Sequence, residues 1–321
     1  MTDTATPTTP AFITRAPRSL AAWVACFEPA LLPVLAATAQ TLEALRAVED
    51  EVDAHLLAET VGADPLMMLK LLSHVAQLRR GRDGSEPETA TEALVMLGIP
   101  PFFRAFGVQD TPEQRLADWP EALAGFSKVL RRSHRAADFS IGFAVHRLDH
   151  DAAVLHEAAL LHDFAEMLLW LQAPGLALNI QRLQQADPAL RSAQAQRQVL
   201  GIELAELQHA LMTRWGLPAL LVQITDDHSL QPTIQVRNVQ LAIRVARHSA
   251  AGWDNPALPD DIREIAQLLQ LNTDTTQRLL QGIDSDAAEE GLDAVPAAGL
   301  GWTLGTAAES AVQTSAPVSR A

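Results

Sequence analysis

Two segments of the sequence combine histidine and aspartate in a pattern that could bind a divalent metal ion. His162 and Asp163 are adjacent within the apolar run LLHDFAEMLL, and His134 lies upstream in the segment RRSHRAADF. Imidazole nitrogens and carboxylate oxygens are ligands of Zn²⁺ and other first-row divalent ions, and three of them leave an open position for a hydrolytic water. A histidine on an apolar helix face is more often a core residue, so a purely structural role stays open.

Helical periodicity directs both histidines toward the interior. In residues 121–148 apolar side chains recur at steps of three and four, and His134 lies on the same stripe. Residues 155–169 repeat the pattern as a further helix, with His162 on its apolar face and Asp163 beside it. Two histidines on the inward faces of consecutive helices could converge in space, which is the condition for a shared site.

The composition and the spacing of helix-breaking residues predict an all-α protein. Apolar residues form 48% of the 321 residues, Ala and Leu dominate, and Tyr is absent, a mixture that favours helices over strands. Prolines and glycines separate short helical patterns along the chain, and no alternating segment is long enough to build a sheet.

Several helix ends are visible in the sequence. Asp64 is placed to cap a helix that has Pro65 at its first position, and either Thr89 or Thr91 caps the next helix. Gly216 lies where a left-handed residue would end a helix. These signals place helix boundaries independently of the apolar periodicity.

The charge of −15 argues against polyanionic partners. Such a field repels phosphate backbones and anionic lipids, so we expect neither nucleic-acid binding nor membrane binding. The clusters RRGR (79–82) and RRSHR (131–135) could hold an anionic partner, although such clusters are more often solvated faces. A single cysteine, no secretory leader and no membrane-length apolar run indicate a reducing, cytoplasmic location.

Five ordered segments make the chain resemble the HDOD family, the HD-related output domains that form a degenerate branch of the HD phosphohydrolase superfamily. The segments lie within about residues 30–250 and read LLPVLAAT, AETVGADPLMMLKLLSHV, ATEALVMLGIPPFFRAFGV, EAALLHDFAEMLL and LMTRWGLPALLVQITDDHS. The HD pattern is a histidine, a His-Asp pair and a distant aspartate. The resemblance implies a helical, cytoplasmic and generally noncatalytic domain associated with signal transduction.

With this resemblance, the chain divides into an N-terminal helical half packed on a degenerate HD-like helical half. The repeated apolar spacing in IREIAQLL and TTQRLLQGI adds a helical extension that docks on the body. The predicted boundaries are a flexible tail at 1–17, the N-terminal half at 18–112, the HD-like half at 113–250, the extension at 251–285 and a disordered tail at 286–321.

The resemblance breaks down at the last position of the HD pattern. Arg247, in VARHSA, stands where a metal-binding relative carries its final aspartate. If the helices keep the family arrangement, its guanidinium could bind Asp163 and repel a metal ion, or it could extend into solvent. Asp226, Asp227 and His228 could restore a lost carboxylate, although an acidic cluster after a helix is more often a solvated boundary.

The resemblance implies a noncatalytic regulatory or scaffolding module of bacterial signal transduction that binds a signalling protein or a small ligand. In this interpretation His134, His162, Asp163 and Arg247 form a vestigial site with no catalytic residue and no cofactor. Two alternatives stay open. One is a metal-dependent phosphohydrolase whose divalent ion is held by His134, His162 and Asp163. The other is a nucleotide-binding sensor in which Arg247 contacts phosphate.

Overall fold

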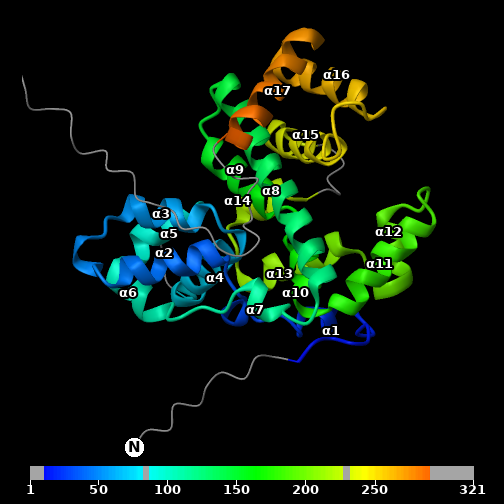
Figure 1. The fold of residues 1–321 in the computed structure, drawn as a ribbon. Coiled ribbons are helices and arrows are strands. Elements are labelled where there is room, and N and C mark those ends of the chain that lie inside the picture. The colour runs from blue at the N-terminus through cyan, green and yellow to red at the C-terminus, as the bar shows by residue number, and fades with distance from the viewer. Residues whose placement is uncertain (1–10, 82–86, 227–231, 290–321) are drawn as a thin grey trace, which may run out of the picture.

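The computed structural model describes residues 11–81, 87–226 and 232–289, and within these ranges the chain forms helices and turns with no β-strand (Figure 1). The all-α prediction is confirmed. The helices are α1 (Leu20–Val24), α2 (Ala36–Arg46), α3 (Ala54–Gly62), α4 (Pro65–Arg79), α5 (Ala90–Leu97), α6 (Ile99–Ala105), α7 (Pro112–Arg115), α8 (Pro120–Arg147), α9 (Ala152–Leu161), α10 (Phe164–Gln172), α11 (Pro174–Ala186), α12 (Ser192–Leu200), α13 (Leu204–Trp215), α14 (Ala219–Ile224), α15 (Ile234–His248), α16 (Leu258–Leu269) and α17 (Thr273–Glu289), with the short 3₁₀ helices η1 (Pro29–Leu31) and η2 (Glu49–Glu51).

Helix ends follow the capping signals of the sequence. The Asp64 carboxylate accepts hydrogen bonds from the backbone N–H groups of Leu66 and Met67, at 2.8 and 3.1 Å. Thr89, rather than Thr91, caps α5, and Gly216 adopts a φ of 71° at the end of α13. Capping satisfies the backbone donors that a helix start leaves without intrahelical partners, so Asp64 and Thr89 fix where α4 and α5 begin.

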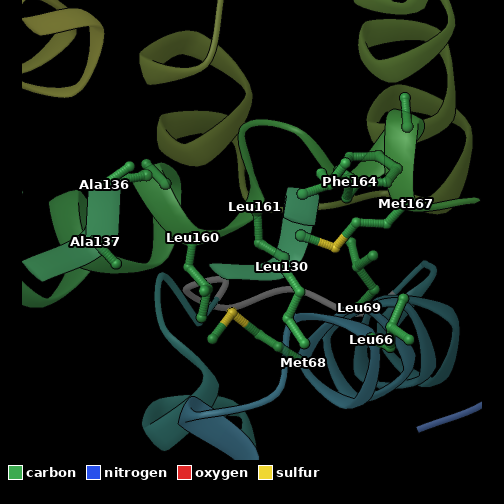
Figure 2. Close-up of a cluster of buried hydrophobic side chains, with 14 of the residues drawn as sticks. Leu66, Met68, Leu69, Leu130, Ala136, Ala137, Leu160, Leu161, Phe164 and Met167 are labelled. Atoms are coloured by element: carbon green, nitrogen blue, oxygen red, sulfur yellow. The ribbon is translucent and has the colours of Figure 1, made fainter. Parts of the chain in front are cut away.

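Helix α4 joins the two halves of the molecule. Its side chains Leu66, Met68 and Leu69 face Leu130 of α8 together with side chains of α9 and α10 (Figure 2). One continuous buried cluster therefore extends from the N-terminal helices into the HD-like half. Burying each such side chain contributes roughly 1.5–3 kcal/mol, which makes this joint a major source of stability. The predicted boundary between the halves, at residues 112 and 113, falls at the start of α7.

The long helix α8 is the axis of the HD-like half, and α9, α10, α15 and α17 pack around it. The contact between α8 and α10 depends on a glycine. A Cβ at Gly125 would lie 2.6 Å from the indole ring of Trp170 on α10. The missing side chain therefore lets α8 and α10 approach closely, with the indole filling the space between them.

The C-terminal extension docks on α8 and α15 through α16 and α17. The guanidinium of Arg135, on α8, donates to both carboxylate oxygens of Asp284 on α17, at 2.7 and 3.0 Å. The indole N–H of Trp253 donates to the same carboxylate at 3.2 Å. Helix α17 continues to Glu289, whereas the sequence prediction ended the extension at residue 285.

Part of the predicted N-terminal tail lies against the body. The Phe12 ring is 4.4 Å from the Arg115 guanidinium, and the backbone N–H of Ile13 donates to the carbonyl of Gln172 at 2.7 Å. The flexible-tail prediction for 1–17 is therefore wrong for residues 11–17, because their apolar side chains bury surface that the sequence pattern did not assign to a helix. Residues 1–10 and 290–321 lie outside the described ranges. No helix in those ranges has the length and apolarity needed to cross a bilayer.

Candidate functional site

The His-Asp pair lies at a break between two helices. Helix α9 ends at Leu161 and α10 begins at Phe164, and Asp163 has the nonhelical angles φ −105° and ψ 20°. The prediction of one continuous helix over 155–169 is therefore wrong at this point. Short polar residues such as aspartate disfavour helix interiors, and here the break leaves both His162 and Asp163 lining a cavity.

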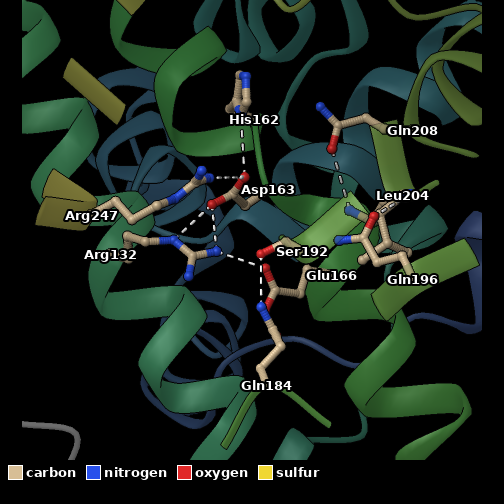
Figure 3. Close-up of polar contacts among 11 residues, drawn as sticks. Arg132, His162, Asp163, Glu166, Gln184, Ser192, Gln196, Leu204, Gln208 and Arg247 are labelled. Carbon is tan, nitrogen blue, oxygen red and sulfur yellow. Dashed lines mark hydrogen bonds and ion pairs between the residues drawn. The ribbon is translucent and has the colours of Figure 1, made fainter. Parts of the chain in front are cut away.

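Arg132, from α8, is the main partner of Asp163. Its Nε and Nη2 atoms donate to one Asp163 oxygen at 2.8 and 2.5 Å, and Nη2 also donates to Glu166 at 2.7 Å (Figure 3). Although burial alone would raise the pKa of Asp163, the Arg132 charge, the His162 hydrogen bond and the Arg247 charge hold that pKa well below its usual range. The carboxylate is therefore charged and its charge is compensated inside the protein.

Arg247 plays a smaller part than the sequence suggested. Its Nη2 atom lies 3.9 Å from the second oxygen of Asp163, and its side chain is 53% exposed. The predicted pairing is present as a long ion pair, while the closer guanidinium comes from the RRSHR cluster. That cluster was favoured as a solvated face, which is wrong for Arg132. The sequence pattern could have predicted an inward Arg132, because it lies three residues after Val129 and four before Ala136, and both of these residues are buried.

His134 occupies a different environment from the His-Asp pair. It does not line the cavity, and burial together with the nearby His156 of α9 lowers its pKa to about 4. Its Nε2 atom has no hydrogen-bond partner among the described residues. His134 is thus a neutral interior histidine, and the structure does not bring it into a three-ligand set with His162 and Asp163.

Among the described residues, the side chains around Asp163 do not fit a divalent ion. Within residues 11–81, 87–226 and 232–289, no group of three or more His, Cys, Asp or Glu side chains is arranged to hold a metal. A metal ion at Asp163 would also meet the charges of Arg132 and Arg247. Of the predicted auxiliary residues, Asp226 lines the cavity, whereas Asp227 and His228 lie outside the described residues.

The cavity beside Asp163 has a volume of about 520 Å³. It is bounded by α8, α10, α11, α12 and α13, with Arg247 contributed by α15. Its charged lining residues are Lys128, Arg132, Arg247, Asp163, Glu166 and Asp226, with His162 and His209. A volume in the range of roughly 300–1,000 Å³ is typical of small-molecule sites, so the size suits a metabolite.

The structure is a helical body with a His-Asp pair at a helix break, where the aspartate is paired with arginine. The model of the HDOD domain matches residues 32–230, which is more than half of the chain. The chain belongs to the HDOD family.

Solved structures support the same fold. The response regulator MmoQ of Methylococcus capsulatus str. Bath is similar with a TM-score of 0.61 and 20% identity, over 78% of this chain and 97% of that one. A virulence factor of Campylobacter jejuni is similar with a TM-score of 0.55 and 16% identity, over 84% and 99% of the two chains. At these identities the likeness shows the fold alone. Comparison with curated proteins gives no match.

Proposed function

We propose that the chain is a noncatalytic regulatory module of bacterial signal transduction that responds to a small ligand or a protein partner. The observation that carries this proposal is the compensation of Asp163 by Arg132 beside a cavity of about 520 Å³. The residue that would hold a metal in an HD enzyme is engaged internally, while the space for a ligand is kept. Membership of the HDOD family supports the association with signalling.

The protonation state of Asp163 also weighs against hydrolysis. A general base works best when its pKa lies near the operating pH, and the pKa of Asp163 is held well below its usual range. One carboxylate oxygen accepts from Arg132 and the other contacts His162 Nδ1 at 3.1 Å. Activation of a water molecule at this carboxylate would therefore require rearrangement of the whole cluster.

A metal and turnover assay tests the proposal. The full chain is incubated with Zn²⁺, Mn²⁺ or Fe²⁺, its metal content is measured, and hydrolysis of bis-p-nitrophenyl phosphate and of nucleotides is followed. We expect no stoichiometric metal and no turnover above the blank. Metal-dependent turnover that disappears in His162→Ala, but persists in His55→Ala at an exposed remote position, would establish the phosphohydrolase alternative instead.

A nucleotide-binding sensor is the second candidate. Its support is Arg247, which lines the cavity and has a half-exposed guanidinium able to contact a phosphate. This candidate predicts that AMP stabilises the protein without added metal, by about 2.7 kcal/mol at a hundredfold excess over its dissociation constant. The measurement is denaturant unfolding with and without AMP.

A further inference from the structure

One wall of the cavity carries uncharged hydrogen-bonding side chains from three consecutive helices. A carboxamide both donates and accepts hydrogen bonds, as a hydroxyl group does, so such a wall is chemically matched to a hydroxylated molecule. The side chains are Gln181, Gln184 and Gln185 on α11, Ser192 and Gln196 on α12, and Gln208 on α13.

Two of these amides have their oxygen directed at a backbone N–H group. The Gln196 oxygen accepts from the N–H of Leu204 at 2.9 Å, and the Gln208 oxygen accepts from the N–H of Ala165 at 3.5 Å (Figure 3). Both N–H groups belong to the first turn of a helix, where they lack intrahelical partners. Each amide oxygen thus accepts a hydrogen bond from the backbone, and the two N–H₂ groups remain as donors.

These two N–H₂ groups have no partner in the part of the chain that the structure describes. Neither Nε2 atom has a hydrogen-bond partner among the described residues, and the Gln208 side chain is only 6% exposed. Gln196 is partly buried, and both amides line the cavity, so their N–H₂ groups can donate to the acceptor atoms of a ligand there.

Other residues of the lining carry positive charge. Arg132 is engaged by Asp163 and Glu166, whereas Arg247 is half-exposed and Lys128 has no hydrogen bond or ion pair within the described residues. Asp226 also lines the cavity and offsets one of these two cations. The lining holds three cations and three carboxylates and is neutral overall. Arg247 and Lys128 can therefore meet one anionic group of a ligand, whereas the lining has no excess positive charge to balance a polyanion.

We propose that the cavity binds a small hydroxylated organic anion of the sugar-acid or sugar-phosphate type. Its charged group contacts Arg247 and Lys128, and its hydroxyl-bearing part accepts from the amides of Gln196 and Gln208. This inference rests on the proposed function and specifies its ligand.

Binding is measured on the full chain by calorimetry and by thermal unfolding with gluconate, glucose 6-phosphate, AMP, glucose and inorganic phosphate. We expect gluconate or glucose 6-phosphate to bind at least tenfold more tightly than either glucose or phosphate. Comparison of these two anions distinguishes a carboxylate from a phosphate ligand. Binding of AMP without either sugar anion would overturn the inference, because the base and not the hydroxylated part would then be recognised.

Matched variants test which residues recognise the ligand. Gln196→Glu and Gln208→Glu keep the oxygen that accepts from the backbone but replace an N–H₂ donor by negative charge, so each should weaken binding at least tenfold. Gln198→Glu makes the same change at an exposed position of α12 outside the cavity and should bind normally. Arg247→Gln should also weaken binding, whereas Arg237→Gln, exposed on the same helix and outside the cavity, should not.

The outcomes separate this inference from the proposed function. Equal effects in Gln196→Glu and Gln198→Glu would overturn the placement of the ligand, as would unchanged binding in all the cavity variants. Absence of binding by every anion, with no metal-dependent turnover, would overturn the ligand class alone. Metal-dependent hydrolysis of any probe would overturn the noncatalytic function itself. Circular dichroism of each variant verifies folding, and Gln196→Glu keeps the test valid if the buried Gln208→Glu does not fold.

Discussion

Replacement of Arg132 by methionine tests whether this internal cation stabilises the cluster around Asp163. Arg132 is 19% exposed and binds Asp163 and Glu166, which are 13% and 33% exposed. Removing one partner of a buried ion pair costs roughly 3–5 kcal/mol, because the remaining charge is left uncompensated. We expect a loss of about 3 kcal/mol, at the lower end of that range, because Arg247 and His162 still face Asp163 and Glu166 reaches solvent.

A second substitution isolates the uncompensated charge. Arg132→Met with Asp163→Asn removes both members of the main pair, so the double variant should be more stable than Arg132→Met alone. Neighbouring residues that share a contact are expected to be non-additive in this way. The free energy of unfolding is measured in urea at pH 7, with Arg131→Met as the control on the same helix, since no ion pair or hydrogen bond of Arg131 occurs within the described residues.

The pH dependence gives a further check on the same cluster. The folded-state pKa of Asp163 is depressed, so its contribution is present above the unfolded value of about 3.9 and is lost as pH falls toward the folded value. The stability difference between wild type and Arg132→Met should therefore shrink below about pH 4. A loss under 1 kcal/mol at pH 7, or a double variant no more stable than the single one, would refute the reasoning.

Two other predictions concern buried positions outside the cluster. Burial raises the pKa of Glu157 from 4.5 to about 8, so its contribution is present below pH 4.5 and is lost as pH rises through 8. The unfolding free energy of the wild type should thus fall between pH 4.5 and 8, while that of Glu157→Gln should change less. Parallel pH profiles of the two proteins would contradict the raised pKa of Glu157. Gly125→Ala places a Cβ 2.6 Å from the Trp170 ring and should cost about 1–3 kcal/mol by overpacking. The melting temperature measures that loss, and an unchanged value would show that the indole moves freely.

Local features of the fold were accessible from the sequence because they depend on residues close in the chain. The Asp64 cap, the Gly216 terminus and the long helix α8 each follow from side chains within one or two turns of the feature. The ordered motifs likewise sufficed to predict the HDOD family, since they extend over the residues that the family model matches. The short segment at 11–17 was missed because its contacts, such as Ile13 with Gln172, are made to distant residues.

At the candidate site, too, the residues were found from the sequence but their long-range contacts were not. Its aspartate, its neighbouring histidine and Arg247 were identified from spacing and resemblance, yet the dominant partner was not. Arg132 and Asp163 are 31 residues apart, and an arginine on an inward stripe can turn toward a carboxylate or extend to solvent with nearly the same sequence pattern. The sequence correctly placed His134 on an inward stripe of α8. It did not predict the neighbours of His134, which include His156 on α9.

By itself, the sequence determined the helical class, many helix ends and the family, because short-range periodicity, capping and ordered motifs are properties of neighbouring residues. Only the tertiary structure decided that Asp163 is neutralised by Arg132, that the His-Asp pair opens onto a cavity, and that Gln196 and Gln208 line the same cavity. The physical reason is that charge compensation and cavity shape depend on how helices far apart in the chain pack against one another.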